Sequence, residues 1–450
     1  MEITVHSSKS LKPDYGDGCR VAGDVIPLSV FDMVNYDKYI FYVYAFHPSA
    51  PPSVALEAGL ARALAAYPEW AGRVGDGPAI VLCDASAWFA DATTDSELGS
   101  GATALLAAGS KVLSLYPSGD GTEELLLVQA TRFRCCSLVL GFTMHHKVAD
   151  GPAMWNFMAA WGQATRGVAI NPVQVHDRTS LFARRGPPQI RFEHRGVELK
   201  PLDEKPGGGG TQGAQVAGIG DDEVVVHKTL DFSREWIMEL KSHVSEGGPR
   251  SYSTLQCLAA YFWRCITKAR GLDGRQATMI RIAVNGTRMR HPRVPKGYTG
   301  SVVLWAWPTT TARQPLDRPL RYAVELISRE VARMDDAYFR SFIDFASSGA
   351  VEEEMLVPTA DAAEVRLGNN VDLDSVLAIP FPKLDFGCGA PFFFRPCYSP
   401  APVDGAIYVV KSLAGDGSVD AYVPLLSRTM ESFKKCCYSL PVPPLVAARL

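Results

Sequence analysis

The sequence places one histidine and one aspartate at a spacing that could support proton transfer. They begin and nearly end the run His-Lys-Val-Ala-Asp-Gly at residues 146–151. A neutral imidazole, with an ordinary pKa of about 6.5, can accept a proton from a reacting nucleophile, so His146 is a candidate general base. Asp150 could orient the local backbone by ion pairing, and Gly151 permits a tight turn because it lacks a Cβ atom. A lone His-x-x-x-Asp spacing often arises by chance, so its surroundings decide its meaning.

The residues around this motif predict a rigid setting for the histidine. Residues 136–144 are nearly all apolar, which predicts a strand buried on both faces. Alternation along the strand puts His146 on the same face as Met144 and turns His145 the other way. After the motif, Pro152 stands in the first turn of a predicted helix that ends at residues 166–167. A histidine between such elements can hold one ring nitrogen in a cavity.

The rest of the chain is predicted to form two α/β units. Helices are predicted at residues 54–66, 234–244, 253–268, 319–335 and 429–436, and strands at residues 123–133, 224–226, 407–413 and 421–426. The composition changes between residues 185 and 223, where four glycines at 207–210 indicate a flexible crossover. Since a domain has about 100–200 residues, the 450 residues divide into an N-terminal domain at 1–185, a crossover loop at 186–223 and a C-terminal domain at 224–450.

Composition excludes several classes of function. The formal net charge is −3 and no basic run occurs, so a nucleic-acid partner is not expected. No signal peptide and no apolar stretch of about 18 residues is found, which predicts a cytoplasmic protein without membrane contact. Ten cysteines include two vicinal pairs but no Cys-x-x-Cys, so we expect buried free thiols and no metal site.

A second motif connects the first to a known family. Residues 385–389 read Asp-Phe-Gly-Cys-Gly, and together with residues 146–151 they resemble the Asp-Phe-Gly-Trp-Gly and His-x-x-x-Asp-Gly signatures of the plant BAHD acyltransferases. Further matches extend the resemblance over nearly the whole chain, at residues 5–8, 27–32, 67–73 and 297–301. Residues 1–9, 347–352 and 416–424 are similar to grass enzymes that make hydroxycinnamoyl amides of agmatine, putrescine or tryptamine.

The resemblance implies a fold and a set of structural roles. The fold would be two domains that resemble chloramphenicol acetyltransferase, each a mixed β-sheet with flanking helices, joined by a long crossover loop. His146 would lie at the centre of a channel between them. Asp150 would support the site by pairing with an arginine, for which Arg288 is the candidate. Structural roles would also fall to the motif residues Gly151, Asp385, Phe386, Gly387 and Gly389.

The resemblance also suggests residues that bind coenzyme A. The acyl donor would be a coenzyme A thioester, used as a co-substrate, with no permanently bound cofactor. Ser251, Ser253, Tyr298 and Thr299 align with regions near coenzyme A in the family. A helix N-cap at Ser251 or Ser253 is an equally good interpretation of the two serines, and capping does not exclude ligand contact.

A cationic acceptor would need a carboxylate in its pocket, since burying an unpaired charge is costly. Asp372 and Asp374 are the candidates, with two exposed loop acids as the alternative interpretation. Val376 and Cys388 stand where relatives carry tryptophan, and the two smaller side chains would widen the pocket for an aromatic amine. A catalytic thiol at Cys388 is an alternative, although no base adjoins it in sequence to activate it.

These expectations define an acyl-coenzyme-A-dependent N-acyltransferase. It would transfer a hydroxycinnamoyl or benzoyl-type group directly to a primary amine of the agmatine, tryptamine or putrescine class, without an acyl-enzyme. One alternative is O-acylation of an alcohol such as shikimate or quinate. A thioester hydrolase and a non-catalytic binding protein that retains the fold are the others. The expected partners are the two small substrates, and the expected oligomeric state is a monomer.

Overall fold

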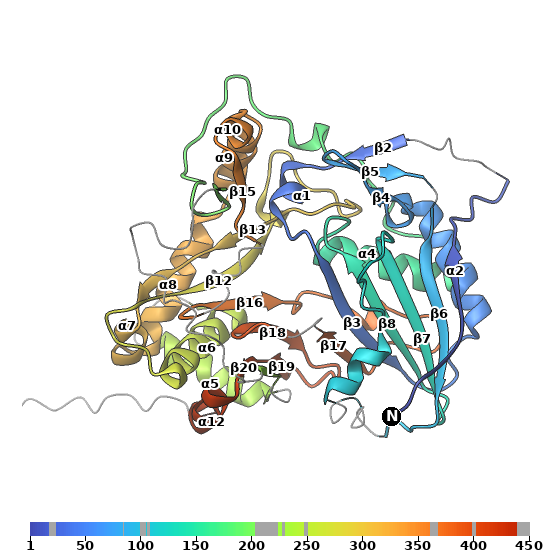
Figure 1. Cartoon of the computed structure of the whole chain (residues 1–450). Coiled ribbons are helices and arrows are strands. Elements are labelled where there is room, and N and C mark those ends of the chain that lie inside the picture. Colours follow the sequence, from blue (N-terminus) through green and yellow to red (C-terminus); the bar gives the residue numbers. More distant parts are fainter. Residues whose placement is uncertain are drawn as a thin grey trace, which may run out of the picture.

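A computed structural model of the chain describes residues 1–17, 24–83, 85–99, 105, 109–202, 224–226, 230–246, 251–360, 368–397 and 402–438. Two large sheets dominate the described residues, one built mainly from each half of the chain (Figure 1). Each sheet contains both parallel and antiparallel neighbours and is flanked by helices. The protein therefore has the predicted α/β architecture.

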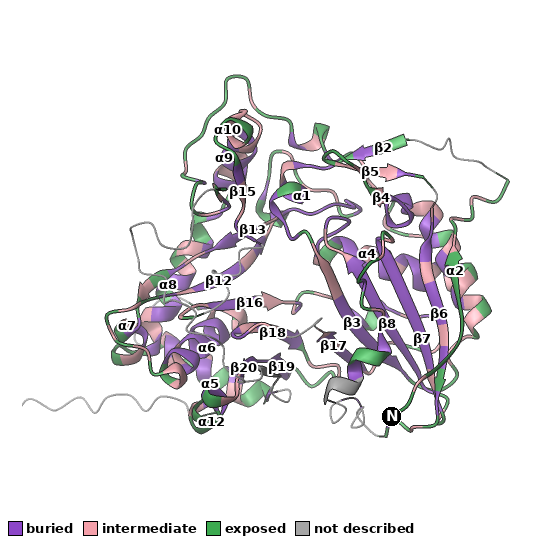
Figure 2. Ribbon diagram, in the orientation of Figure 1, coloured by how far each residue is buried: buried purple, intermediate pink, exposed green. Residues whose placement is uncertain are grey.

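The first sheet carries the histidine motif at the end of one central strand. Its strands, in spatial order, are β1 (Thr4–Leu11), β6 (Ala87–Thr94), β7 (Leu126–Phe133), β8 (Leu138–His145), β3 (Tyr39–Phe46) and β17 (Phe393–Cys397). Helices α2 (Ser53–Ala66) and α4 (Gly151–Thr165) share a hydrophobic core with one face of β8. Figure 2 shows β3, β7 and β8 buried along most of their length, so the predicted two-sided burial of β8 is confirmed.

The second sheet forms the opposite wall of the site. Its strands, in spatial order, are β11 (Leu230–Phe232), β19 (Val419–Tyr422), β18 (Ala406–Lys411), β16 (Val371–Ser375), β12 (Ala277–Asn285) and β13 (Val303–Ala306), and β14 (Thr309–Thr311) also pairs with β12. Strand β16 runs parallel to both of its neighbours. The core on this side is completed by α5 (Arg234–Ser245), α6 (Thr254–Arg270), α8 (Leu320–Arg333), α9 (Asp336–Ala346) and α12 (Ser427–Cys436).

The remaining described elements are short. They are the strands β2 (Asp24–Pro27), β4 (Arg73–Val74), β5 (Ala79–Leu82), β9 (Leu199–Pro201), β10 (Val224–Val226), β15 (Leu356–Pro358) and β20 (Pro424–Leu426), the helices α1 (Val30–Val34), α7 (Arg313–Asp317) and α10 (Ala350–Glu353), and the 3-10 turns η1 (Pro68–Ala71), η3 (Gly109–Leu115), η4 (Ser180–Phe182), η5 (Gly286–Arg288) and η6 (Phe381–Lys383). Strands β2, β5 and β4 form a small sheet, and β9 pairs with β15.

Local capping signals set the ends of the helices near the site. Helix α4 begins after Asp150, whose carboxylate accepts a hydrogen bond from the amide of Ala153, and it carries a proline in its first turn. Helix α6 begins with a capping box between Ser253 and Gln256, and it ends at Gly271, which has a φ of 60° in the left-handed region. The predicted helix positions are confirmed here because these signals act within one turn.

The two halves of the chain interleave across the predicted domain division. Strand β17 comes from the C-terminal half but pairs with β3 of the first sheet. Phe386 also belongs to the core of the first sheet, where its ring packs against Phe46 and Trp161. In the other direction, Phe31 packs against Phe339 and Phe342 of α9. The site therefore lies between two sheets that share segments.

Part of the predicted crossover is fixed against the second half. Buried Asp344 of α9 accepts hydrogen bonds from the backbone amides of Arg185, at 2.9 Å, and Gln189, at 2.7 Å. These bonds attach the backbone at residues 185 and 189 to α9, while the flexibility of the crossover stays a prediction. The glycine run at 207–210 falls outside the described residues. The single strand predicted at 421–426 is divided, since β19 pairs with β18 while β20 pairs with β10.

Within the part of the chain that the structure describes, the helices are too short or too polar to cross a lipid bilayer.

The close approach of β8 to η3 gives a stability prediction. A Cβ atom at Gly141 would lie 1.9 Å from the carbonyl oxygen of Leu115, so Gly141→Ala must displace the backbone of η3. Overpacking of this kind costs about 1–3 kcal/mol of the free energy of unfolding, measurable by chemical denaturation. Gly77→Ala is the matched control, because a Cβ there meets nothing within 4 Å. Equal stability of the two variants would contradict the prediction.

Candidate active site

The two adjacent histidines at the end of β8 lie in different surroundings. The ring of His145 packs edge-on against Tyr39 at 4.9 Å between centroids, and its Nε2 lies 3.5 Å from the Asp37 carboxylate. His146 follows the last residue of β8, and its amide donates to the carbonyl oxygen of Lys38 at 2.9 Å. Its ring lines a cavity between the two sheets. Strand alternation thus predicted correctly that the two side chains diverge.

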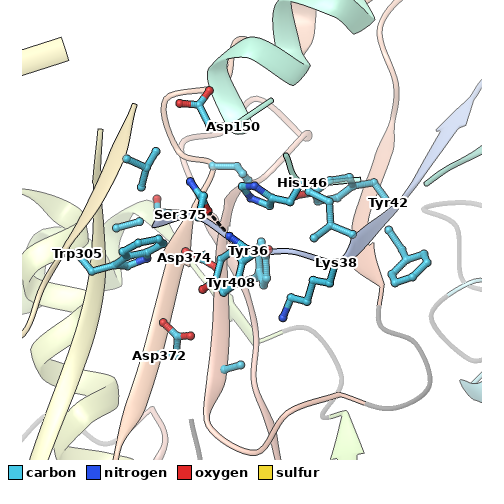
Figure 3. Close-up of a pocket in the computed structure, with 18 of the residues that line it drawn as sticks. Tyr36, Lys38, Tyr42, His146, Asp150, Trp305, Asp372, Asp374, Ser375 and Tyr408 are labelled. Carbon is cyan, nitrogen blue, oxygen red and sulfur yellow. Dashed lines mark hydrogen bonds between the residues drawn. The ribbon is translucent and has the colours of Figure 1, made fainter. Parts of the chain in front are cut away.

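The cavity of about 260 Å³ is enclosed by residues from both halves of the chain. Figure 3 shows Trp305 and His146 on opposite sides of the view, with Tyr36, Asp374 and Tyr408 between them. The lining includes Tyr36, Lys38, Phe41, Tyr42, Asp150 and His146 from the first half, and Trp305, Asp372, Asp374, Ser375, Val376 and Tyr408 from the second. Several aromatic faces and a few polar groups therefore converge on one histidine, which is the usual composition of a small-molecule site.

Burial keeps the imidazole of His146 uncharged. Loss of hydration lowers its pKa from 6.5 to about 3, and the nearby positive charge of Lys38 acts in the same direction. Its Nδ1 atom is shielded from solvent and makes no hydrogen bond to the described residues. The ring of Tyr36 packs edge-on against it at 5.2 Å between centroids. Packing therefore holds a neutral imidazole in the cavity.

Asp150 joins the histidine turn to the second half of the chain. One carboxylate oxygen accepts from the amide of Ala153, and the other accepts from the amide of Val302, each at 3.0 Å. Burial raises the pKa of Asp150 to about 6, although these two backbone hydrogen bonds act against the increase. Its role in this structure is to cap α4 and to hold the segment that leads into β13.

The predicted partnership of Asp150 with Arg288 is wrong. Arg288 ends the exposed turn η5, and its guanidinium donates to the carbonyl oxygen of Val331 on α8 at 2.6 Å. The turn after β12 carries this side chain away from the cavity. A different arginine, Arg178, lies in the protein interior beside the histidine turn and donates to the carbonyl oxygens of Lys147 and Val148.

The second motif supports the far end of α4. The carboxylate of Asp385 accepts hydrogen bonds from the amides of Gly387 and Gly389, at 2.7 and 2.8 Å, and pairs with Arg166 at 3.2 Å. The two glycines have φ angles of 109° and 86°, in a region that side chains disfavour. Phe386 packs edge-on against Trp161 of α4. The motif thus stabilises the helix that follows His146 and stays outside the cavity lining.

The structure separates the two candidate acceptor carboxylates. Asp372 forms a two-point ion pair with Arg281, at 3.0 and 2.5 Å, and the same guanidinium donates to the hydroxyl of Tyr36. Burial alone would lower the pKa of Arg281, but the charge of Asp372 raises it above its ordinary value. Asp372 is therefore neutralised within the protein. Asp374, two residues later on β16, is partly exposed and lines the same cavity.

Of the two positions predicted to widen the pocket, the cavity includes one. Val376 lines it, whereas Cys388 lies beside the first core and outside the lining. Burial and the neighbouring Asp385 raise the pKa of the Cys388 thiol. A protonated thiol outside the cavity is unsuited to nucleophilic catalysis, so the geometry gives the catalytic alternative for Cys388 no support.

The residues predicted to contact coenzyme A divide into two groups. Ser251 and Ser253 are exposed, and Ser253 caps α6, so their contact with coenzyme A stays a prediction. Tyr298 and Thr299 are 4% and 1% exposed and lie outside the cavity lining. Tyr298 packs edge-on against Phe182, and the Thr299 hydroxyl donates to the carbonyl oxygen of Val175. Their side chains face the interior and pack within the protein, so contact of this segment with coenzyme A also stays a prediction.

Several functional candidates were not found from the sequence. Tyr36, Tyr408 and Trp305 line the cavity, and Arg178 lies behind the histidine turn. Arg178 stands in a polar stretch near the predicted crossover, where an arginine is normally solvated. Trp305 and Tyr408 lie on β13 and β18, whose pattern is equally typical of core, and Tyr36 lies in the loop between α1 and β3. Within the described residues, no cluster of three or more His, Cys, Asp or Glu could hold a metal ion.

The depressed pKa of His146 predicts a specific loss of stability in acid. The unfolded chain binds a proton on this residue below pH of about 6.5, whereas the folded protein binds it only near 3, so stability falls as pH falls through this window. Between pH 7 and pH 5 the loss is about 2 kcal/mol. Over the same change from pH 7 to pH 5, His146→Asn should lose about 2 kcal/mol less stability than the wild-type protein, as measured by urea denaturation at the two pH values. Equal losses in both proteins would disprove a buried neutral histidine.

The chain is similar to named plant enzymes over nearly its whole length. It matches the Transferase family over residues 1–440. It is 55% identical over 449 residues to agmatine coumaroyltransferase-1 of Hordeum vulgare, which covers 98% of this chain and 100% of that protein. Agmatine hydroxycinnamoyltransferase 1 of Oryza sativa subsp. japonica is 55% identical over 451 residues, with 98% and 99% covered. Putrescine hydroxycinnamoyltransferase 3 of the same plant is 43% identical over 451 residues, with 98% and 100% covered.

Solved structures share the fold at low identity. Vinorine synthase aligns with a TM-score of 0.69 and 18% identity over 96% of each chain. TRI101 of F. graminearum, in complex with coenzyme A and deoxynivalenol, aligns with a TM-score of 0.74 and 18% identity over 92% of this chain and 97% of that one. With the two motifs and the interleaved sheets, these findings show that the chain belongs to the BAHD family of acyl-coenzyme-A-dependent acyltransferases.

Proposed function

We propose that this acyltransferase joins a hydroxycinnamoyl or benzoyl-type group to a primary amine of the agmatine, putrescine or tryptamine class. The observation that carries the proposal is that a neutral histidine, His146, and a carboxylate, Asp374, line the same aromatic cavity. The histidine suits proton removal, and the carboxylate suits a cationic acceptor. Relatives named for agmatine and putrescine support the same class. A monomer in the cytoplasm remains a prediction.

The reaction needs a base that is free of its proton when the amine arrives. The amine nitrogen attacks the thioester carbonyl, the C–N bond forms, and the C–S bond breaks. Nitrogen becomes acidic as it bonds to carbon, and Nε2 of His146 accepts its proton at that moment and passes it to the departing thiolate of coenzyme A. Burial keeps this imidazole neutral, so it need not release a proton first. Direct transfer of this kind leaves no acyl-enzyme.

The aromatic walls suit an acyl group with a ring. Tyr36, Tyr42 and Trp305 line the cavity, and the hydroxyl of Tyr36 is fixed by Arg281. A planar hydroxycinnamoyl or benzoyl group can pack between such faces, and the apolar surface excludes water that would hydrolyse the thioester.

The acceptor end of the proposed site is centred on Asp374. Burial raises the pKa of Tyr42, a hydrogen bond with Tyr408 acts against the increase, and the negative charge of Asp374 adds to it. Asp374 of β16 and Tyr408 of β18 are register partners in the second sheet, and Figure 3 shows them side by side. Asp374 is partly exposed and lines the cavity, and it is the carboxylate that we assign to the distal cation of the amine.

The discriminating experiment is an acceptor panel with feruloyl-coenzyme A. We expect an amide product with agmatine, putrescine or tryptamine, and no ester with shikimate or quinate, whose carboxylate would meet Asp374. His146→Ala should reduce amide formation by about 10²–10⁴-fold, the usual contribution of a general base. Product identity is read by mass spectrometry, and thiol release is followed in parallel.

Each rival function has its own outcome in this panel. Exclusive ester formation would establish O-acylation instead. Free acid released at the same rate without any acceptor would indicate a thioester hydrolase, and binding of the acyl donor without thiol release would indicate a non-catalytic protein. Unchanged amide formation in His146→Ala would remove the proposed base.

Asp374→Asn should weaken the site for a doubly cationic acceptor. Losing a charged hydrogen bond costs about 1.5–3 kcal/mol, so we expect the KM for agmatine to rise by about 10-fold or more. The KM for tryptamine, whose far end is an uncharged indole, should change much less. Steady-state kinetics with the two amines measure the difference.

The control for this substitution is Asp317→Asn. Asp317 is an exposed carboxylate on α7 that pairs with Arg313. The Asp317→Asn substitution removes one negative charge at a position that does not line the cavity. An equal effect of Asp374→Asn on both amines, or none on either, would remove Asp374 from the acceptor site.

A further inference from the structure

Arg178 makes five polar contacts while its side chain is completely buried. Its guanidinium donates to the carbonyl oxygens of Lys147 at 3.3 Å, Val148 at 2.7 Å and Thr299 at 3.1 Å. It also lies 3.4 Å from a carboxylate oxygen of Asp32 and 3.9 Å from one of Glu69. The first two carbonyls belong to the two residues that follow His146, and the third belongs to the other half of the chain.

The segment at residues 299–302 is held at three points in succession. Arg178 binds the carbonyl of Thr299, Asp32 accepts from the amide of Ser301 at 2.8 Å, and Asp150 accepts from the amide of Val302 at 3.0 Å. These three anchors all come from the first half of the chain. Together they tie the histidine turn to the approach of β13, which carries Trp305 into the cavity.

Charge makes this arrangement rigid. Burial alone would lower the pKa of Arg178, but the charges of Asp32 and Glu69 raise it above its ordinary value. Burial acts to raise the pKa of Glu69, but His176 and Arg178 hold this pKa below its ordinary range. The Nδ1 atom of His176 lies 3.2 Å from a carboxylate oxygen of Glu69. A charge this deeply buried is tolerated only with its partners in place, so each member fixes the position of the others.

Space is as restricted as charge. Gly300 lies against the arginine, and a Cβ atom there would approach its Nε to 3.0 Å, its Cδ to 3.1 Å and the hydroxyl oxygen of Tyr298 to 2.8 Å. A side chain at position 300 would therefore displace Arg178 without removing any charge. The chain thus offers two independent ways to disturb the same contacts.

We propose that Arg178 is a positioning residue for acyl transfer: by holding the carbonyls of Lys147 and Val148 against Thr299, it sets His146 at the correct distance from substrates bound to the second half. The inference rests on the proposed role of His146 as base. A displacement of about 1 Å at a reacting group can cost about 10²-fold in rate, so the effect should fall on kcat. Substrate contacts in the cavity are made by other residues, so KM should change little.

The test compares Arg178→Lys with Gly300→Ala. Lysine keeps the positive charge but lacks the planar fork that reaches three carbonyls, and Gly300→Ala keeps the arginine but moves it. We expect both variants to lose about 10²-fold in kcat at temperatures well below their melting points, with KM for acyl-coenzyme A and amine within about threefold. Arg288→Lys and Gly77→Ala are the matched controls, since both residues lie outside this cluster.

A second measurement does not depend on catalysis. Hydrogen exchange followed by mass spectrometry should show faster exchange in both variants at two segments, residues 146–151 and 299–302, with other segments unchanged. Full kcat in Arg178→Lys, or an activity loss that only tracks the unfolded fraction, would overturn the positioning role. If the wild-type protein forms no amide, the proposed function fails. Unchanged hydrogen exchange at residues 146–151 and 299–302 in the two variants would separately refute the proposal that Arg178 holds these segments together.

Discussion

The site depends on one buried charge, the guanidinium of Arg178. It lies where the turn after His146, the cap of α1 and the segment before β13 meet, and each contributes a carbonyl or carboxylate to it. A cation in this position is favourable only when all of these partners are present, because an unpaired buried charge is very costly. The two halves of the chain must therefore assemble together for the histidine turn to adopt its position.

Asp150 completes this assembly in an unexpected way. The motif aspartate neither contacts the imidazole nor pairs with the arginine predicted for it. It caps α4 with one oxygen and binds the amide of Val302 with the other. One side chain thus starts the helix that follows the histidine and connects it to the opposite wall of the cavity. The second motif stabilises the other end of the same helix, through Asp385 and Arg166.

The two carboxylates of β16 that line the cavity have different surroundings. Arg281 forms an ion pair with Asp372 and donates a hydrogen bond to the hydroxyl of Tyr36. The ring of Tyr36 packs against His146. The partly exposed Asp374 is the carboxylate that we assign to the substrate. The buried surroundings also keep the imidazole of His146 neutral. The same low polarity that disfavours a charged histidine excludes the water that would compete with an amine for the thioester.

The sequence by itself determined most of the local elements and identified His146 as the candidate base. Strand alternation separates His146 from His145, and capping residues such as Asp150 and Ser253 mark helix starts, because both effects act over a few neighbouring residues. Only the tertiary structure decided which charges meet. Arg178 and Arg288 both follow polar residues in the sequence, yet Arg178 is buried beside the histidine turn, whereas Arg288 ends the exposed turn η5 and contacts α8. Contacts between residues more than a hundred positions apart depend on how two interleaved sheets pack, which no local pattern encodes.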